Sequence, residues 1–346
     1  MPARDGDLLR VENLRVSFSS GKRTVRVVDG VDLTLRRGAT LGLVGESGSG
    51  KSVTAMSIMG LLDAAGSTEP GSSIAFDGRE LTELGEPDLR VLRGSDIAMI
   101  FQEPMTSLNP VMRVGEQIAE VVRLHTSATR AEAATRAVEM LDLVGIATPE
   151  LRARDFPHQL SGGMRQRIMI AMALVCTPKL LIADEPTTAL DITIQAQILQ
   201  LLRSLREASD MAMLLITHDL GVVTEMAEDV AVMYAGEVVE RGRTADVLRR
   251  PQHPYTRALI NTVPKLKASQ DEPLEAIPGT VPSPANWPVG CRFADRCAFA
   301  FDKCRIEAPP MFQLEDQEAA CWLHENGEPL PAEPQPAELR RKGAAS

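Results

Sequence analysis

The sequence predicts an α/β fold, in which a parallel sheet carries a helical insert and is followed by a small loop-rich C-terminal domain. Short apolar runs such as "TLGLV" and "LLIAD" are typical of strands that are covered on both faces of a parallel sheet. A helical periodicity covers most of the stretch from about 89 to 157. Beyond Leu259 prolines and cysteines become frequent, which favours loops over helices or central strands.

The overall composition is that of an ordinary globular protein. The chain has 346 residues, of which 44% are hydrophobic and 24% charged, so it is long enough for one large core and a smaller unit. Its net charge of -10 argues against a nucleic-acid partner. No apolar run approaches the roughly 20 residues that span a bilayer, and the N-terminus lacks the apolar segment of a signal peptide. We expect the protein to stay inside the cell and to reach a membrane only through a partner.

The local patterns place the elements along the chain. We expect an edge strand ending at Phe18, a hairpin turning at Asp29-Gly30, a strand over Thr40–Val44 and a helix from Lys51 to about Leu62. In the helical stretch one apolar face is expected to comprise Ala134, Val138, Leu141 and Val144. Two buried strands follow in "KLLIADEP" and "AMLLITHD", and a hairpin turning at Ala235-Gly236 comes next.

These elements divide the chain into three parts. Residues 1–255 are expected to form the main α/β domain, with a helical subdomain at about 88–158. Residues 256–324 are expected to form the C-terminal domain. Residues 325–346 have the composition of a disordered tail.

A glycine-rich loop predicts a nucleotide site. The stretch "GESGSGKS" fits the pattern G-x-x-x-x-G-K-[ST] and lies between an expected strand and an expected helix, as this phosphate-binding P-loop requires. Lys51 is expected to neutralise the β- and γ-phosphates, and the Ser52 hydroxyl to bind Mg²⁺. The expected ATP-binding residues of this loop are Gly45, Glu46, Ser47, Gly48, Ser49, Gly50, Lys51, Ser52 and Val53.

Three side chains at strand ends supply the chemistry of hydrolysis. Asp184 ends one apolar strand and is expected to hold Mg²⁺, while Glu185 follows it and can act as the base for the attacking water. His218 ends the next strand, where it can contact the γ-phosphate.

Together these motifs resemble the ATP-binding subunits of ABC transporters, from about residue 8 to 259. The resemblance implies a P-loop NTPase fold of the ABC type, with Gln102 of "MIFQEP" touching Mg²⁺ and facing a membrane partner. It makes Phe18 the aromatic residue that stacks on adenine, although a plain core position would also explain Phe18.

A second glycine-rich stretch, "LSGGMRQR", resembles the signature motif of the same family. Its glycines precede a helix, whose N-terminus favours an anion. In the family this motif completes the ATP site of another subunit, and "TALD" is the accompanying D-loop. The residues implied to act on the partner's ATP are Leu160, Ser161, Gly162, Gly163 and Asp191.

The C-terminal part narrows the resemblance. The extra domain of oligopeptide and dipeptide permease ATPases, whose relatives also import nickel, resembles three stretches of this chain. They are "HPYTRAL", "IPGTVPSP" and the cysteine segment, which runs from Cys291 to Cys321. This implies uptake of peptides at the cytoplasmic face of the membrane. The implied partners are a second ATPase subunit, identical or homologous, two transmembrane permease subunits and an extracytoplasmic solute-binding protein.

The cysteines predict a metal centre. Cys176 stands alone in an apolar run and is expected to be a small buried residue. The other four, Cys291, Cys297, Cys304 and Cys321, are separated by five, six and sixteen residues, unlike the C-x₂-C pairs of common zinc sites. Resemblance to the permease group favours a structural 4Fe–4S cluster, with zinc or no metal as alternatives. We expect this centre to be distant from the P-loop.

Two other functions remain open from the sequence. A soluble ABC-type ATPase of DNA repair or translation usually has two nucleotide domains, a coiled-coil insert or a basic face, and this chain has none of these features. A regulatory subunit without hydrolysis is disfavoured because Glu185 and His218 are both present.

Overall fold

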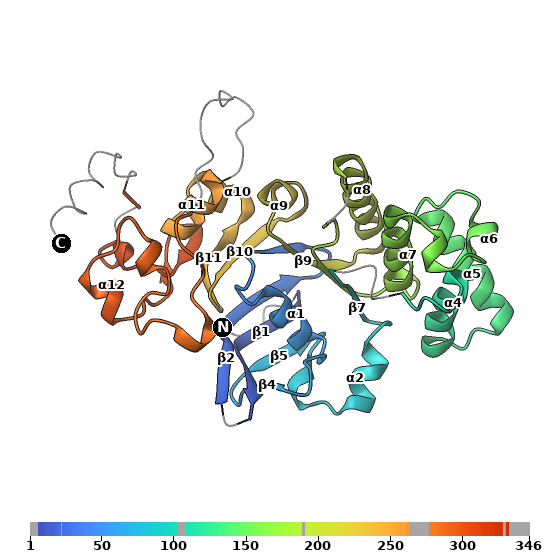
Figure 1. Cartoon of the computed structure of the whole chain (residues 1–346), viewed down its shortest axis with the longest axis horizontal. Coiled ribbons are helices and arrows are strands. Elements are labelled where there is room, and N and C mark those ends of the chain that lie inside the picture. The colour runs from blue at the N-terminus through green and yellow to red at the C-terminus, as the bar shows by residue number, and fades with distance from the viewer. Residues whose placement is uncertain are drawn as a thin grey trace.

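The computed structural model describes residues 6–21, 23–102, 108–188, 191–262, 277–327 and 330–331. Two sheets with helices packed on and between them form the fold (Figure 1). Of the expected tail, only 325–327 and 330–331 lie within the described residues.

The larger sheet carries the parallel strands that the apolar runs predict. Its order is β12-β13-β11-β10-β3-β9-β8-β7, with β10, β3, β9, β8 and β7 all parallel. Every residue of β3, β8 and β9 is buried, which is the reason that these strands read as continuous apolar runs. Their bounds are β3 Thr40–Val44, β7 Ile97–Ile100, β8 Leu180–Asp184, β9 Ala212–Thr217, β10 Asp229–Tyr234 and β11 Glu237–Arg243.

The smaller sheet differs from the sequence prediction at two strands, β1 and β2. β1 (Asp7–Ser20) is not an edge strand, because β2 pairs with one side of it and β4 (Gly66–Thr68) and β5 (Ser73–Phe76) with the other. β2 (Arg23–Arg36) is one long strand and not a hairpin at Asp29-Gly30. Gly30 has a φ of 71° and lies where the pairing with β1 shifts register, so this dipeptide forms a bulge. β6 (Arg79–Glu80) completes the sheet.

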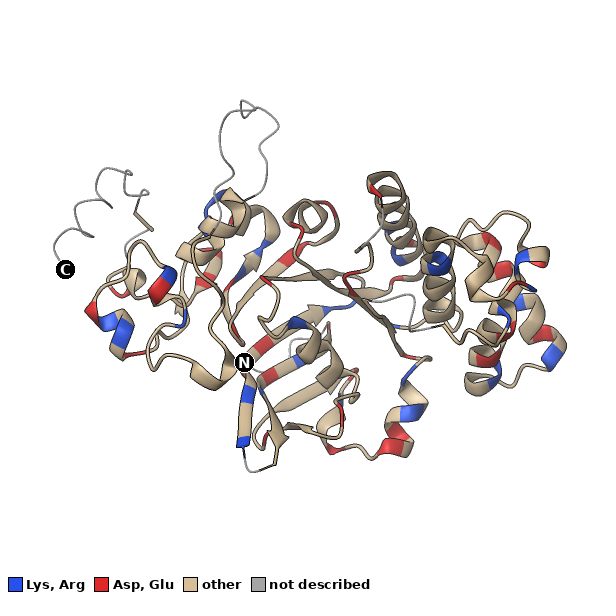
Figure 2. Cartoon of the chain, viewed as in Figure 1, with Lys and Arg blue, Asp and Glu red and all other residues tan. Residues whose placement is uncertain are grey.

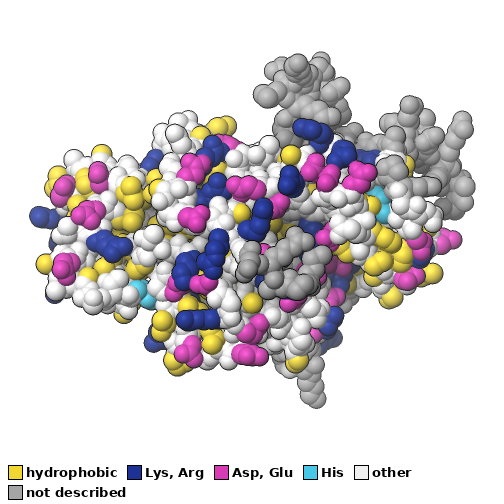
Figure 3. All heavy atoms as spheres, turned by 180° about the vertical axis from the view of Figure 1, so that it is seen from behind, with side chains coloured by type: hydrophobic (Ala, Val, Ile, Leu, Met, Phe, Trp, Pro, Cys, Tyr) yellow, Lys and Arg dark blue, Asp and Glu magenta, His cyan; other side chains and the backbone are white. Residues whose placement is uncertain are grey.

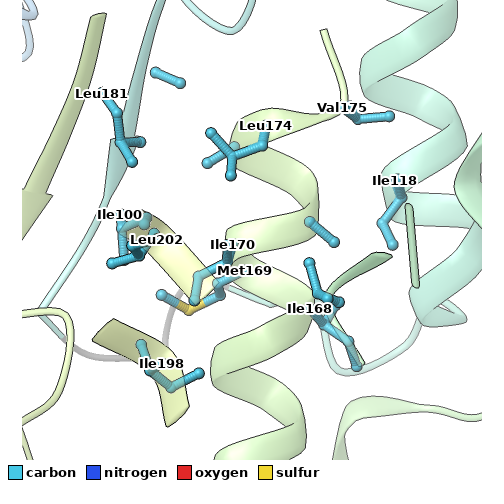
Figure 4. Close-up of a cluster of buried hydrophobic side chains, with 14 of the residues drawn as sticks. Ile100, Ile118, Ile168, Met169, Ile170, Leu174, Val175, Leu181, Ile198 and Leu202 are labelled. Atoms are coloured by element: carbon cyan, nitrogen blue, oxygen red, sulfur yellow. The ribbon is translucent and has the colours of Figure 1, made fainter. Parts of the chain in front are cut away.

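Helices fill the space between the sheets and cover the outer face of the larger one. α1 (Lys51–Ile58) lies in the core between the two sheets. On the other face lie α7 (Gly162–Leu174), α8 (Ile192–Ser209) and α9 (Leu220–Met226). α7 packs its apolar residues against β7, β8, α8 and the helical subdomain (Figure 4). α2 (Glu86–Leu92) leads into β7.

The helical subdomain that was expected over about 88–158 includes strand β7 near its start. The α-helices of its described residues after β7 are α4 (Val114–His125), α5 (Arg130–Leu143) and α6 (Pro149–Arg152). The predicted apolar face of α5 is only partly right: Leu141 is buried, but Ala134 is exposed and Ala133 and Ala137 are buried in its place. The limits of the subdomain and of the other predicted domains stay predictions.

The C-terminal part is built onto the main sheet. β13 (Gln317–Ala319) pairs with β11, and β12 (Phe312–Gln313) with β13, so the segment extends the sheet by two strands. α10 (Thr244–Arg249) and α11 (Pro254–Asn261) precede it, and α12 (Asp302–Ile306) lies within it. The C-terminal residues therefore share a core with the α/β domain, formed by side chains such as Tyr234, Tyr255 and Phe293.

Charges of both signs are mixed over the surface. In Figure 2 patches of Lys and Arg and patches of Asp and Glu are both scattered over the fold. On the face drawn in Figure 3 the described residues also form a mixed pattern, with small groups of hydrophobic side chains between them. Among the helices that the structure describes, none combines the length and the apolar character needed to cross a bilayer.

Candidate active site

The glycine-rich loop joins β3 to α1 and has a backbone that other residues would disfavour. Gly45, Gly48 and Gly50 all have positive φ values, of 155°, 80° and 102°. A Cβ at Gly45 would collide with the carbonyl oxygen of Met233 on β10. Glycine at this position therefore allows the loop to pass close to the neighbouring strand. Val53 lies in the first turn of α1, half-buried, directly after the loop.

Lys51 lies inside the loop. Lys51 is only 6% exposed, and its Nζ donates to the carbonyl oxygens of Gly45 at 2.8 Å and Glu46 at 3.0 Å. Burial lowers the pKa of Lys51, and the carboxylates of Glu185, Asp184 and Glu46 oppose this effect. An ammonium group in this position can exchange loop carbonyls for phosphate oxygens.

Asp184 and Ser52 offer oxygen ligands of the kind that bind magnesium. Asp184 is the last residue of β8 and only 4% exposed, and burial raises its pKa while a hydrogen bond from Ser52 lowers it. Among the described residues, its Oδ1 atom is buried without a hydrogen-bond partner. A buried carboxylate oxygen without a partner, next to a hydroxyl, matches the oxygen ligands that Mg²⁺ prefers.

Three side chains from different segments converge on the Glu185 carboxylate. Gln102 Nε2 donates to Oε2 at 3.1 Å, and Thr188 Oγ1 donates to the same atom at 2.7 Å. His218 Nδ1 lies 3.2 Å from Oε1. The structure thus brings together the catalytic residues predicted from separate motifs. The Thr188 contact was missed, because the sequence marks Thr188 only as the start of a D-loop.

The protonation and backbone of Glu185 suit a base. Burial would raise the pKa of Glu185, but the hydrogen bonds from Thr188 and His218 outweigh burial and hold it below the ordinary value. The carboxylate is therefore ionised at neutral pH. Its backbone has a φ of 47°, a left-handed conformation that is uncommon for non-glycine residues and that here turns the chain sharply after β8.

The signature residues lie at a second place, the N-terminus of α7. Ser161 is exposed and caps the helix by accepting a hydrogen bond from the Met164 amide at 3.3 Å. Leu160 before it is buried, and Gly163 packs against Ile194. Asp191 caps the neighbouring α8 in the same way, with the Ile194 amide at 2.9 Å. Residues 189 and 190 of the expected D-loop lie outside the described residues.

Phe18 packs in the smaller sheet. It is half-buried, pairs with Gly66 across strands β1 and β4, and contacts the core between the sheets. These contacts are those of a core residue, and stacking on adenine stays a prediction.

The four C-terminal cysteines line a single pocket. Cys291, Cys297, Cys304 and Cys321 share it with His253 and apolar side chains such as Phe293 and Trp322, and all four are free thiols. Burial raises the pKa of Cys297 to about 11 and that of Cys291 and Cys321 to about 12. Among the described residues, no three His, Cys, Asp or Glu side chains are arranged to hold a metal ion.

Two family models match the chain. The model described as ABC transporter matches residues 28–188, and the model described as oligopeptide/dipeptide transporter, C-terminal region, matches residues 239–304. The oligopeptide transport ATP-binding protein AppD of Bacillus subtilis is 50% identical over 92% of this chain and 97% of its own length. The oligopeptide transport ATP-binding protein OppD of Salmonella typhimurium is 52% identical over 88% of this chain and 90% of its own length.

A solved structure confirms the predicted fold class. The ATP-binding cassette MJ0796, in a dimeric post-hydrolysis state bound to ADP and Pi, superposes with a TM-score of 0.62 at 27% identity. The match covers 68% of this chain and 98% of that one. The chain therefore belongs to the ATP-binding subunits of ABC transporters, in their oligopeptide/dipeptide group, and is an ATPase.

Proposed function

We propose that this ATPase energises the uptake of short peptides by an ABC importer, from the cytoplasmic face of the membrane. The observation that carries the proposal is the convergence of Gln102, Thr188 and His218 on Glu185, next to a P-loop with a buried lysine. The names of the relatives, oligopeptide transport ATP-binding proteins, support peptides as the transported class.

Each residue of the site has a part in hydrolysis. Lys51 and the loop amides hold the β- and γ-phosphates. Ser52, Asp184 and Gln102 would hold Mg²⁺, which supplies positive charge for the phosphate oxygens when bound. Glu185 accepts the proton of the attacking water, and His218 contacts the γ-phosphate and orients Glu185. Thr188 holds the carboxylate in place from its other side.

The signature residues act on a second ATPase subunit, identical or homologous. Ser161 and Gly162 are exposed at the start of a thirteen-residue helix, where the dipole and free amides favour a phosphate. Within the described residues, the hydrogen bonds of the P-loop to residues beyond the loop and α1 go to Asp184, Gly236, Tyr255 and Arg296, and none goes to α7. A head-to-tail pair of subunits supplies each site with the missing part, and the dimeric state of MJ0796 supports this arrangement.

Two permease subunits and an extracytoplasmic solute-binding protein complete the proposed transporter. The segment around Gln102 is the proposed contact with the permease. Phe101 is 37% exposed and Val111 80% exposed, and they flank residues 103–107, which lie outside the described part. Exposed apolar side chains on both sides of Gln102 suit a protein partner.

We also propose that the four cysteines hold a 4Fe–4S cluster. They are free thiols on one pocket, where Cys304 and Cys321 are buried and Cys291 and Cys297 are half-buried. The spacing of the four cysteines, which are separated by five, six and sixteen residues, is unlike the C-x₂-C pairs of common zinc sites and favours a cluster over zinc. A 4Fe–4S cluster is held by four cysteine thiolates that surround it, and four cysteines are present on this pocket. The cluster would act as a structural link in a segment with a thin core.

Transport in proteoliposomes tests the proposal. The chain is assembled with its permease subunits and binding protein, and uptake of labelled short peptides is measured with ATP on the cytoplasmic side. We expect ATP-dependent uptake that Glu185→Gln abolishes. Uptake of nickel but not of peptides would refute the proposed substrate, and DNA-stimulated hydrolysis in the absence of permease would favour the soluble class.

A further inference from the structure

The P-loop and the cysteine segment touch each other, although 250 positions separate the two contact residues in the chain. Arg296, which directly precedes Cys297, donates from Nη1 to Glu46 Oε2 at 2.6 Å and from Nη2 to Oε1 at 3.0 Å. Two parallel N–H···O bonds are the strongest geometry of an arginine–carboxylate pair. The residue next to Cys297 therefore reaches the P-loop, a contact that the expectation of a distant metal centre did not include.

Arg296 is held in place by the C-terminal segment itself. Its Nε donates to the Pro278 carbonyl at 2.8 Å, and Nη2 also reaches the Ile277 carbonyl at 3.3 Å. Nη1 lies 3.3 Å from the Tyr234 hydroxyl, and the side chain is only 7% exposed. All of its donor nitrogens are thus engaged, so the fold of this segment sets the direction of the guanidinium group.

Glu46 is fixed at its backbone as well. Its amide donates to the Tyr255 hydroxyl at 2.8 Å, and its carbonyl accepts the bond from Lys51. Tyr255 is fully buried in α11, which precedes the C-terminal segment, and its ring packs against Phe293 of that segment. Because Glu46 directly follows Gly45, these contacts fix the start of the P-loop.

The charge of Glu46 requires a partner. A carboxylate within a loop that binds triphosphate repels the ligand, and this side chain is only 27% exposed, so water screens it poorly. Arg296 supplies the opposite charge through a nearly buried guanidinium. An unpaired Glu46 would both lose its position and add a negative charge beside the phosphates.

We propose that Arg296 is a positioning residue of the P-loop, which orients and neutralises Glu46 so that ATP binds tightly only while the cysteine segment is folded against the loop. The inference rests on the nucleotide site proposed above and holds whichever metal the cysteines bind. It makes the C-terminal segment a part of the nucleotide site.

The test is the dissociation constant of ATP, measured by calorimetry on the full-length chain. We expect Arg296→Ala to weaken binding about tenfold, within the range usual for coupled sites. Arg296→Lys should recover only part of the loss, because a point charge cannot replace the two-pronged contact. The matched control is Arg305→Ala, which removes an exposed arginine–aspartate pair in the same segment and should leave the affinity unchanged.

Two measurements separate this role from simple loss of structure. Adding Glu46→Gln to Arg296→Ala should restore most of the affinity, since it removes the unpaired charge. The loss in Arg296→Ala should also shrink between about 0.1 and 1 M salt, where the screening length falls from about 10 to about 3 Å. Unchanged affinity in Arg296→Ala, or a loss that neither treatment reduces, would overturn the inference. Unchanged affinity in Lys51→Ala would instead overturn the nucleotide site itself.

Discussion

Glu185→Gln separates the chemical step from nucleotide binding. The substitution keeps the size of the side chain and one carbonyl oxygen, which can still accept the hydrogen bond from Thr188. It removes the negative charge that Gln102 and His218 also face. The protein should therefore fold and bind ATP, while the attacking water loses its proton acceptor.

The expected loss follows from the role of the residue. A positioned general base contributes about 10²- to 10⁴-fold to the rate, so kcat should fall by that factor, or by about 3–5 kcal/mol of barrier. The cost to folding should be only the difference between charged and neutral hydrogen bonds, about 1 kcal/mol.

Phosphate release by the assembled transporter measures the rate, and calorimetry on the isolated chain measures ATP affinity. Glu207→Gln is the matched control, because Glu207 is exposed on α8. This variant should hydrolyse ATP normally. Glu185→Gln should also accumulate as an ATP-bound pair of subunits on gel filtration. Turnover within threefold of wild type would show that Glu185 is not the base.

Three further predictions concern other parts of the chain. Ser161→Ala should lower hydrolysis in the assembled transporter by about a hundredfold, the usual effect of losing one donor to a developing charge, but leave the ATP affinity of the isolated chain unchanged. The control is Ser204→Ala, because Ser204 is exposed on α8. Loss of ATP affinity in isolated Ser161→Ala would contradict an action on the partner subunit. Anaerobically purified protein should be brown and contain iron and acid-labile sulfide, and Cys297→Ser should lose both while Cys176→Ser keeps them; one equivalent of zinc in colourless protein would replace the cluster by a zinc site. Burial raises the pKa of Glu240 from an ordinary value of 4.5 to about 7 in the folded state. The folded state therefore binds this proton more tightly than the unfolded state. The free energy of unfolding should fall by roughly 3 kcal/mol as the pH rises from 4.5 to 7. Denaturant titrations should show a fall larger by this amount in wild type than in Glu240→Gln, where Glu237, whose pKa burial also raises to about 7, still contributes. An equal fall in both proteins would refute the assignment.

Much of the site was encoded in short contiguous motifs. The loop around Lys51 and the strands that end at Asp184 and before His218 could be predicted, because period, apolar run length and glycine spacing are local properties of the chain. The parallel direction of the strands was also predicted from local pattern. Strands without polar alternation are covered on both faces, which is typical of a parallel sheet. The predicted hairpin at Ala235-Gly236 is confirmed by the antiparallel pairing of β10 with β11. Both residues have the positive φ values of a two-residue hairpin turn.

Other features depended on contacts between distant segments. Asp29-Gly30 looks like a hairpin turn in sequence, but pairing with β1 along its length makes it a bulge. Strand β7 was missed within a helical pattern, because its four residues become a strand only by pairing with β8. β13 likewise gains its hydrogen bonds from β11, which precedes it by more than seventy residues.

The contacts that the base and the P-loop make with distant residues were decided in the same way. Gln102 and His218 reach Glu185 across 83 and 33 positions of the chain. No local pattern marks Arg296 as a partner of Glu46. A charged side chain at a given position reads the same whether its partner is solvent or a carboxylate 250 positions away. The sequence by itself therefore determined the nucleotide chemistry, and only the packing of the C-terminal segment against the sheet decided what holds the P-loop in place.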